Sequence, residues 1–188
     1  MAWTRLVSFR VVATFDKRGR PVGPVGQPRV KAYSRGAKAG VYTPKGANAW
    51  KRLVSDAWES TGVVGPLPGP FRVSMRFEFR RPREQYTMHG KGKNLRYDAP
   101  PFNDKRGRWD VDNCIKAILD ALQVDKEKKH PTRPWADDAS VVKVDAEKRY
   151  AKNPKRPGVV ITIWTWAGQR YHEGIPPSRT QAALDATR

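Results

Sequence analysis

The sequence contains a single cysteine, Cys114, and only three scattered histidines among its 188 residues. One cysteine excludes an internal disulfide and is typical of a protein of the reducing cytosol. A structural zinc site needs four cysteine or histidine ligands at close spacing, and this chain does not offer them. Any metal ion would therefore have to be held by carboxylate oxygens.

Long apolar segments are also missing. The chain has no run of about 18 apolar residues, which a membrane-spanning helix would require. No hydrophobic segment of the signal-peptide kind follows Met1, so secretion is not expected either. The sequence predicts a cytoplasmic protein.

Acidic residues are scarce and unevenly placed. The chain has 37 Lys and Arg residues against 18 Asp and Glu residues, a formal net charge of +19. Such a charge indicates a nucleic acid partner, because Lys and Arg gain by releasing counterions from phosphates. The first 55 residues hold twelve basic residues and one acidic residue, whereas seven of the twelve aspartates fall between Asp110 and Asp145. We therefore expect a basic surface with an acidic spot set in it.

Hydrophobic periodicity predicts six main elements in the order β-α-β-α-β-β. Strands are expected at Leu6–Phe15, Phe71–Phe79, Val141–Lys148 and Val159–Trp166, and helices at Pro44–Glu59 and Asp112–Leu122. This order predicts an α+β fold, a mixed β-sheet with two principal helices packed on it. The polar segment 81–108 is expected to be a long loop. We expect one domain over residues 1–168 and a flexible tail over residues 169–188.

The stretch "RWDVDNCIKAILDAL" places two aspartates one residue apart, directly before the second helix. Asp110 and Asp112 can converge on one side of an extended approach. Lys116 follows Asp112 by one helical turn, and Asp120 follows by another, so we expect an exposed stripe of these side chains. Helix capping explains one of the two leading aspartates but leaves the other unexplained.

A calcium-binding loop of the EF-hand type also begins with "DVDN". That loop requires glycine at its sixth position and glutamate at its twelfth. The chain has Ile115 and Ala121 there, which excludes this interpretation.

The stretch "WADDASVVKV" supplies two further aspartates, Asp137 and Asp138, at the start of a strand. The connection from Gln123 could span up to roughly 50 Å, so it is long enough to return to the beginning of the helix. We expect three or four carboxylates to gather there, and such a cluster is stable only with raised pKa values or with a bound cation. Mg²⁺ prefers oxygen ligands of this kind. A Mg²⁺ site on a phosphate-binding surface predicts phosphodiester hydrolysis, with Lys116 offsetting charge on the reacting phosphate.

The two motifs "DVDNCIKAILDAL" and "WADDASVVKVDAEK" resemble those of the RusA-type Holliday junction resolvases, which are crossover junction endodeoxyribonucleases. "GQPRVKA", "VYTPKGANAWKRLV" and "GPFRVSMRFEFRRP" resemble upstream segments of phage and prophage members. The chain departs from the family pattern at Trp109, where proline is common, and in the longer connection before the second motif.

The resemblance implies a Mg²⁺-dependent homodimer that cuts four-way DNA junctions by paired symmetric nicks in recombination and repair. Mn²⁺ is expected to substitute for Mg²⁺, and the setting would be a bacterial cell or a phage-infected host. By position, the resemblance implies that Asp110, Asp112 and Asp138 are the catalytic metal-binding carboxylates and that Lys116 is the catalytic lysine. Asp138 is preferred over Asp137 by the family's register alone.

The candidate phosphate contacts are basic residues of the loops and strand ends before the acidic motif. They are Arg29, Lys31, Arg80, Arg81, Arg83, Lys91, Lys93, Arg106 and Arg108. Trp109 and Trp135 flank the acidic motifs, where core packing and stacking on a base are both open. Two other functions are also open: a non-catalytic basic protein that binds DNA or RNA, and a nuclease of another class that uses Glu127 and Lys129.

Overall fold

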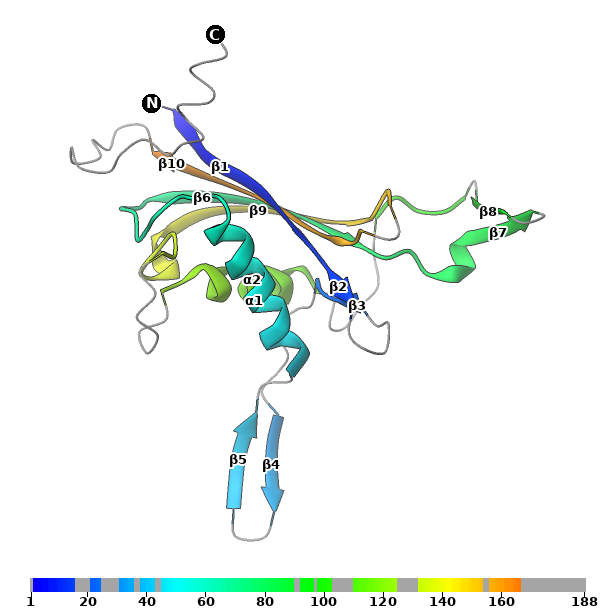
Figure 1. The fold of residues 1–188 in the computed structure, drawn as a ribbon, viewed down its shortest axis with the longest axis horizontal. Coiled ribbons are helices and arrows are strands. Elements are labelled where there is room, and N and C mark those ends of the chain that lie inside the picture. Colours follow the sequence, from blue (N-terminus) through cyan, green and yellow to red (C-terminus); the bar gives the residue numbers. More distant parts are fainter. Residues whose placement is uncertain are drawn as a thin grey trace.

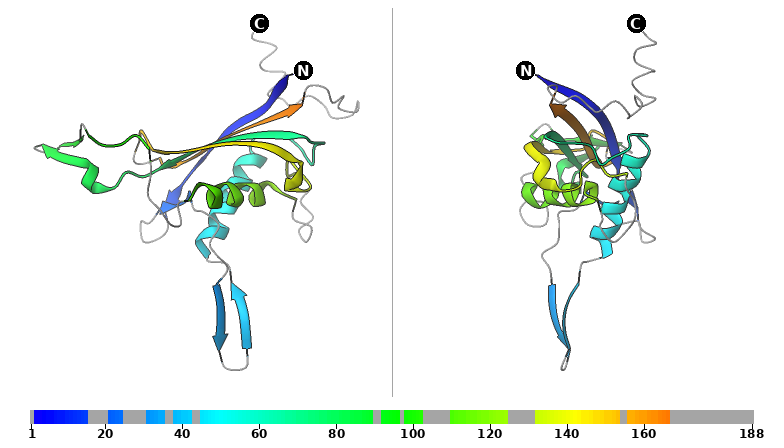
Figure 2. Two further views of the ribbon diagram at one scale, coloured as in Figure 1. Left: turned by 180° about the vertical axis from the view of Figure 1, so that it is seen from behind. Right: turned by 90° about the vertical axis from the view of Figure 1, so that its left-hand side faces the viewer.

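The chain folds into a four-stranded mixed sheet with two helices on one of its faces (Figures 1 and 2). The computed structural model describes residues 2–15, 21–24, 31–35, 38–42, 45–89, 92–96, 98–102, 110–124, 132–153 and 156–166. The strand order is β1-β10-β6-β9. The bounds are β1 (Trp3–Val12), β6 (Phe71–Phe79), β9 (Val141–Tyr150) and β10 (Gly158–Trp166). This architecture confirms the predicted α+β class and the mixed sheet.

The direction of the strands determines where the second helix lies. β10 is antiparallel to both β1 and β6, whereas β9 is parallel to β6. A parallel pair needs a crossover connection between its strands, usually a helix. That helix is α2 (Val111–Leu122), which follows β6 in sequence, precedes β9 and contacts it. α2 therefore lies at the β9 side of the sheet.

The core lies between the sheet and the two helices. β6 alternates strictly, because its odd-numbered residues are buried against the helices and its even-numbered residues face the other way. α1 (Lys45–Glu59) buries one stripe and packs beside α2. The fully buried large side chains include Trp50, Val54, Trp58, Phe71, Phe77, Ile118 and Leu122. Within the described residues, neither helix is long and apolar enough to cross a membrane.

The smaller elements are not strands of the four-stranded sheet, and two strand pairs among them project away from the layered body (Figure 1). They are β2 (Thr14–Phe15), β3 (Pro21–Val22), β4 (Lys31–Arg35), β5 (Lys38–Tyr42), η1 (Arg83–Gln85), β7 (Tyr86–His89), β8 (Gly92–Leu95) and η2 (Asp138–Ser140). Within the expected loop 81–108, η1 and the antiparallel β7–β8 pair form regular structure. The sequence did not indicate this pair, because no apolar alternation marks a hairpin that packs on no core. The expected tail 169–188 lies outside the described residues.

Candidate active site

The two leading aspartates lie together where α2 begins. Asp110 occupies the N-cap position with extended backbone, but its side chain makes no capping hydrogen bond. Its backbone carbonyl instead accepts from Cys114 N at 3.1 Å. Asp112 is exposed in the first turn. Both carboxylates thus lie at the positive end of the helix dipole, and the capping explanation does not account for the Asp110 side chain.

The rest of the expected stripe divides into two parts. Lys116 is exposed one turn after Asp112, as predicted. Asp120 is turned toward α1, where its Oδ2 lies 2.9 Å from Lys51 Nζ. The prediction that Asp120 belongs to the exposed stripe is therefore wrong, because a neighbouring helix offers it an ion pair.

The second acidic motif forms the short helix η2 directly before β9. Asp137 Oδ1 accepts a hydrogen bond from Ala139 N at 2.9 Å, so this carboxylate caps η2. Asp138 is half-buried at the first position of η2. The capping role of Asp137 supports the preference for Asp138 as the functional residue.

Packing attaches η2 to the far end of α2. Trp135 is completely buried, and its Nε1 donates to Leu119 O at 3.4 Å. Val124 N, just after the helix, donates to Trp135 O at 3.0 Å. A loop before β6 closes on the same segment, because a Cβ atom on Gly69 would lie only 2.9 Å from Ser140 Cβ. Asp138 therefore belongs to the end of α2 that is opposite to Asp110 and Asp112.

The environment of Cys114 shows which end of β9 faces the beginning of α2. Burial raises the pKa of the Cys114 thiol to about 12; the charge of Lys148 opposes this shift, whereas Asp110 and Asp112 add to it. Lys148 is thus close enough to influence the same thiol as the two aspartates. Val141 and Lys148 are about 23 Å apart along an extended strand. The start of β9, which carries η2, is accordingly remote from Asp110 and Asp112.

The structure differs here from the expectation that all these carboxylates gather at one helix N-terminus. The connection after α2 could have returned to the helix start, but burial of Trp135 against Phe71, with ring centroids 5.7 Å apart, holds it at the helix end. Among the described residues, no group of three or more His, Cys, Asp or Glu side chains is placed to hold a metal ion. A single chain therefore presents a pair of carboxylates at one end of α2 and a third carboxylate at the other.

Lys148 is a candidate site residue that sequence reasoning missed. It is in register with Phe77 and so lies on the helix-facing side of the sheet, where it is half-buried. A lysine ammonium on an apolar face is costly unless it has polar partners. The strand periodicity could have placed Lys148 on this face, because Val144, Ala146 and Lys148 lie on the same side of the strand. It did not, because the first two of these residues are apolar and indicate a purely apolar face.

A comparison with protein families identifies the family of this chain. The family model described as Endodeoxyribonuclease RusA matches residues 21–164, well over half of the chain. The chain belongs to the RusA endodeoxyribonuclease family. It is an enzyme that hydrolyses phosphodiester bonds, a Holliday junction-resolving endodeoxyribonuclease. A search of curated proteins gives no match.

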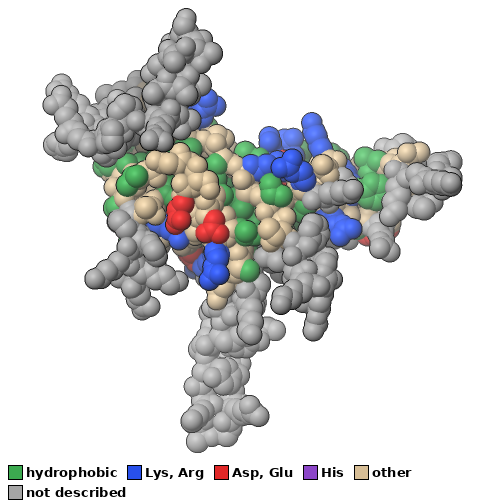
Figure 3. Space-filling model, in the orientation of Figure 1, with side chains coloured by type: hydrophobic (Ala, Val, Ile, Leu, Met, Phe, Trp, Pro, Cys, Tyr) green, Lys and Arg blue, Asp and Glu red, His purple; other side chains and the backbone are tan. Residues whose placement is uncertain are grey.

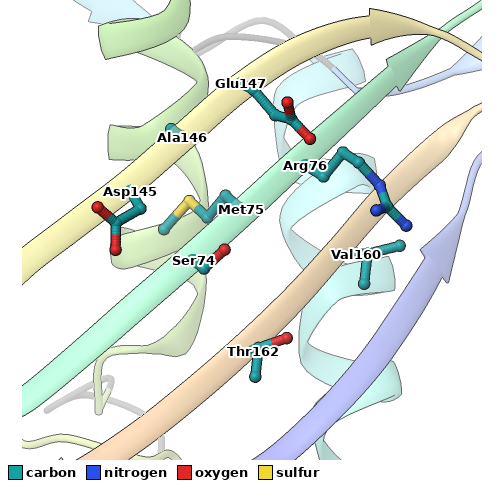
Figure 4. A pocket seen from close by; sticks show the side chains of 8 residues that line it. All are labelled: Ser74, Met75, Arg76, Asp145, Ala146, Glu147, Val160 and Thr162. Carbon is teal, nitrogen blue, oxygen red and sulfur yellow. The ribbon is translucent and has the colours of Figure 1, made fainter.

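Family membership makes the basic surface a candidate DNA interface. Figure 3 shows Lys and Arg side chains gathered over the sheet toward the end that carries β7 and β8. On the sheet face opposite the helices, a cavity of about 300 Å³ opens between Ser74, Arg76, Asp145, Glu147 and Thr162 (Figure 4). This face is not uniformly basic, because Arg72 is paired with Asp145 at 2.8 Å and Arg149 with Glu147 at 2.8 Å.

The predicted DNA contacts of this RusA-family chain fall into three groups. Arg80 is exposed, whereas Arg81 is half-buried, donates to Pro100 O at 2.9 Å and lies over the Tyr150 ring at 4.8 Å. Lys31, Arg83 and Lys93 lie in β4, η1 and β8, and their side chains are not described. The residues outside the described part of the chain are Arg29, Lys91, Arg106 and Arg108.

The structure tests the core-packing and base-stacking interpretations for only one of the two tryptophans beside the acidic motifs. Trp135 is a core residue with no exposed surface, so stacking of this ring on a DNA base is excluded. Trp109 lies outside the described residues, as do Glu127 and Lys129 of the alternative nuclease motif. The non-catalytic alternative is set aside by the family match.

Proposed function

We propose that this RusA-family enzyme resolves four-way DNA junctions by paired symmetric nicks, using Mg²⁺ held by Asp110, Asp112 and Asp138. Lys116 is the catalytic lysine, and Mn²⁺ can replace Mg²⁺. The observation that carries this proposal is the pair of carboxylates at the start of α2, where the Asp110 side chain has no capping role. The enzyme would act in the cytoplasm of a bacterial cell or a phage-infected host.

The donor set fits a hard divalent cation. Asp110 is half-buried and Asp112 is exposed, so both can reach a hydrated ion and a DNA phosphate. Mg²⁺ is commonly bound by one or two carboxylates, with substrate phosphate oxygens and waters completing its shell. When bound, the ion would polarise the scissile phosphate and lower the pKa of a water. Lys116, exposed one turn away, would offset negative charge that develops on the phosphate.

The position of Asp138 supports a homodimer in which each active site draws on both chains. Asp138 is at the far end of α2 from the other two carboxylates, so one chain alone does not bring them together. Two chains related by a two-fold axis with antiparallel α2 helices would place Asp138 of the partner subunit near Asp110 and Asp112. Two such sites per dimer would match the two-fold symmetry of a four-way junction.

Cleavage of a synthetic four-way junction tests the proposed activity. With Mg²⁺, the wild type should give paired nicks at symmetric positions, and chelation of the metal should stop them. Linear duplex of the same sequence is the control substrate. Equal cutting of duplex and junction would contradict junction selectivity while leaving a nuclease.

Mixing of two inactive variants tests whether the site is shared. Asp112→Asn and Asp138→Asn homodimers should each be inactive. In a mixed dimer with shared sites, one site carries both changes and the other carries neither, so single nicks should reappear. If each site is built within one chain, both sites of the mixed dimer stay defective and no nicking returns.

Salt dependence tests the basic surface as the DNA track. Junction binding in Ca²⁺, measured without cleavage, should weaken by about 10³-fold or more between 50 mM and 200 mM salt if six or more phosphates are contacted. A flat dependence would contradict this role of the basic residues.

A further inference from the structure

The antiparallel pair β7–β8 projects from one end of the sheet (Figures 1 and 2). Together with the short helix η1, it forms what we call the arm. The chain enters the arm after β6 and leaves it through residues 99–102, where Phe102 bridges to Arg149. Pro101 O also accepts a hydrogen bond from Tyr150 N at 3.1 Å. The arm is therefore connected to the sheet at the end of β9.

The same end of β9 lies beside the start of α2, which carries Asp110 and Asp112. The far end of α2 adjoins η2 through the bond from Trp135 Nε1 to Leu119 O, and η2 directly precedes β9. Because α2 and β9 also contact each other, the two elements run in opposite directions and β9 ends where α2 begins. The environment of Cys114 indicates the same placement. The arm thus projects from the end of the sheet that carries the two carboxylates.

Arg81 ties the arm to the sheet. Its Nη1 donates hydrogen bonds to Gln85 Oε1 and to Pro100 O, both at 2.9 Å. Its guanidinium carbon lies 4.8 Å from the centroid of the Tyr150 ring. One side chain thus joins the segment that enters the arm, the segment that leaves it and the end of β9. A planar guanidinium can stack on a ring and donate several hydrogen bonds at once, whereas a lysine ammonium has no planar face for stacking.

These contacts make Arg81 a poor candidate for direct binding of a phosphate. Its side chain is half-buried, and its guanidinium is already engaged by Gln85, Pro100 and Tyr150. Arg80, the preceding residue, is exposed. The structure therefore separates Arg81 from the basic residues with which the sequence had grouped it as a DNA contact.

The composition of the arm matches a polyanionic partner. Among the side chains of the arm that the structure describes, none is buried, and Thr87, Asn94 and Leu95 are exposed. A two-stranded pair of this kind is marginally stable in water, so the Arg81 contacts help to hold it in place. Residues 80–98 contain six Lys and Arg residues against two acidic residues. Figure 3 shows further Lys and Arg side chains over the adjoining part of the sheet, so a phosphate backbone could follow both.

We infer that the arm binds one duplex branch of the DNA junction beside the active site, and that Arg81 is the positioning residue that fixes the direction of the arm. This inference rests on the proposed function, because it takes a four-way junction as the substrate. Each strand of the arm has four residues, which corresponds to about 13 Å. At about 3.4 Å per base pair, the arm extends the DNA footprint by about four base pairs.

Removal of the arm tests whether it binds DNA. Replacing residues 86–95 by two glycines closes the chain where Arg96 N already donates to Gln85 O at 3.0 Å. On a four-way junction in Ca²⁺, the hydroxyl-radical footprint should shrink by about four base pairs on one side of each cleavage position. Because Lys91 and Lys93 are removed, affinity at about 0.1 M salt should fall by about tenfold or more, with a salt dependence shallower by about two phosphate contacts. An unchanged footprint and affinity would overturn the inference.

Arg81→Lys tests the positioning role, because lysine keeps the charge but lacks the planar group. A spin label on Asn94→Cys reports the mobility of the arm, since Asn94 is exposed and the native Cys114 is buried. In the DNA-free protein, the label should become more mobile in Arg81→Lys. Arg80→Lys is the matched control and should leave the mobility as in the wild type. Equal label mobility in the two variants would contradict the role of Arg81.

Junction binding and kinetics separate positioning from a direct phosphate contact. Arg81→Lys should raise KM by about fivefold or more and leave kcat within about twofold, because a released arm has to be ordered on binding. In the protein without residues 86–95, the same substitution should not lower the affinity further, since no arm is left to position. A similar loss in both backgrounds would show that Arg81 binds DNA directly and would overturn its positioning role. Thermal unfolding verifies that each variant is folded.

The two proposals fail in different ways. If the protein without the arm binds junctions like the wild type, and the wild type gives paired nicks, the enzyme function stands and the inference about the arm fails. If removal of the arm shrinks the footprint although the wild type cuts no junction, the arm stands as a DNA-binding element and the proposed function fails.

Discussion

The two ends of α2 carry the same type of residue in opposite circumstances. At the end of the helix, Asp120 is half-buried and ion-paired with Lys51 at 2.9 Å, and Trp135 covers the last turn. Ser55 Oγ and the Arg133 guanidinium both donate to Ala121 O. At the beginning, Asp110 makes no side-chain cap bond and Asp112 is exposed. One end of the helix is packed, and the other presents two carboxylates that make no packing contact of this kind.

Under the proposed function, this difference separates the residues that stabilise the fold from those that act in catalysis along a single helix. The packed end can hold α2 in place because its polar groups have partners and its tryptophan is buried. The charged end contributes little to the fold, because Asp110 makes no side-chain cap bond and Asp112 is exposed. Substitutions at the two ends should therefore change different measurements.

The largest effect is expected at the packed end. Trp135→Ala should lower the free energy of unfolding by about 3–5 kcal/mol, because it leaves a large cavity between Phe71 and α2. Chemical denaturation of the DNA-free protein measures this loss. Trp109→Ala, beside the other motif, is the comparison. A loss below about 1 kcal/mol for Trp135→Ala would contradict its role as the anchor of η2.

Asp112→Asn should act on catalysis alone. Junction cleavage should fall by about a hundredfold or more, since a proposed ligand of the catalytic metal ion is lost. The free energy of unfolding should change by less than about 1 kcal/mol, the usual contribution of an exposed aspartate at a helix start. Junction affinity in Ca²⁺ should be retained. Loss of binding together with cleavage would indicate that Asp112 positions DNA or the fold instead of the metal.

Asp120→Asn is the matched change at the other end of the helix. It should lower the free energy of unfolding by about 0.5–1 kcal/mol, because the Lys51 pair is partly exposed, and leave cleavage at the wild-type rate. Parallel measurements with Asp112→Asn would sharpen the comparison. A cleavage defect in Asp120→Asn would show that the active site extends along the whole helix.

The smallest effect is expected for Cys114. Burial raises the pKa of this thiol to about 12, so the thiolate form stays minor in the folded protein as the pH rises from 7 to 9. Iodoacetamide should therefore label the native protein slowly over this range and label the urea-unfolded protein rapidly. Rapid native labelling at pH 8 would show that the beginning of α2 opens readily.

The local sequence pattern was sufficient to predict much of the secondary structure of this molecule. The strict alternation of Phe71–Phe79 predicted β6 and its buried face, and the apolar spacing after Asp112 predicted α2 to within one residue. The spacing of Asp110, Asp112 and Lys116 was also enough to bring them to one end of a helix. These results depend on neighbours a few residues apart, which the periodicity of a helix or strand places directly.

The path of the chain between elements was not available from the sequence. Nothing local indicates that the connection after α2 stays at the helix end, because that outcome depends on Trp135 fitting among residues distant in sequence. The turn of Asp120 toward Lys51 and the inward placement of Lys148 have the same origin.

The amino-acid sequence by itself determined the layered α+β fold and the spacing of the acidic motifs, since these follow from periodicity, and the resemblance of those motifs to a nuclease family agrees with the family match. Only the tertiary structure decided that Asp138 lies away from Asp110 and Asp112 within one chain and that Asp120 pairs with Lys51. The physical reason is that burial of large apolar side chains outweighs the reach of a flexible connection, so the core determines where the charged residues lie.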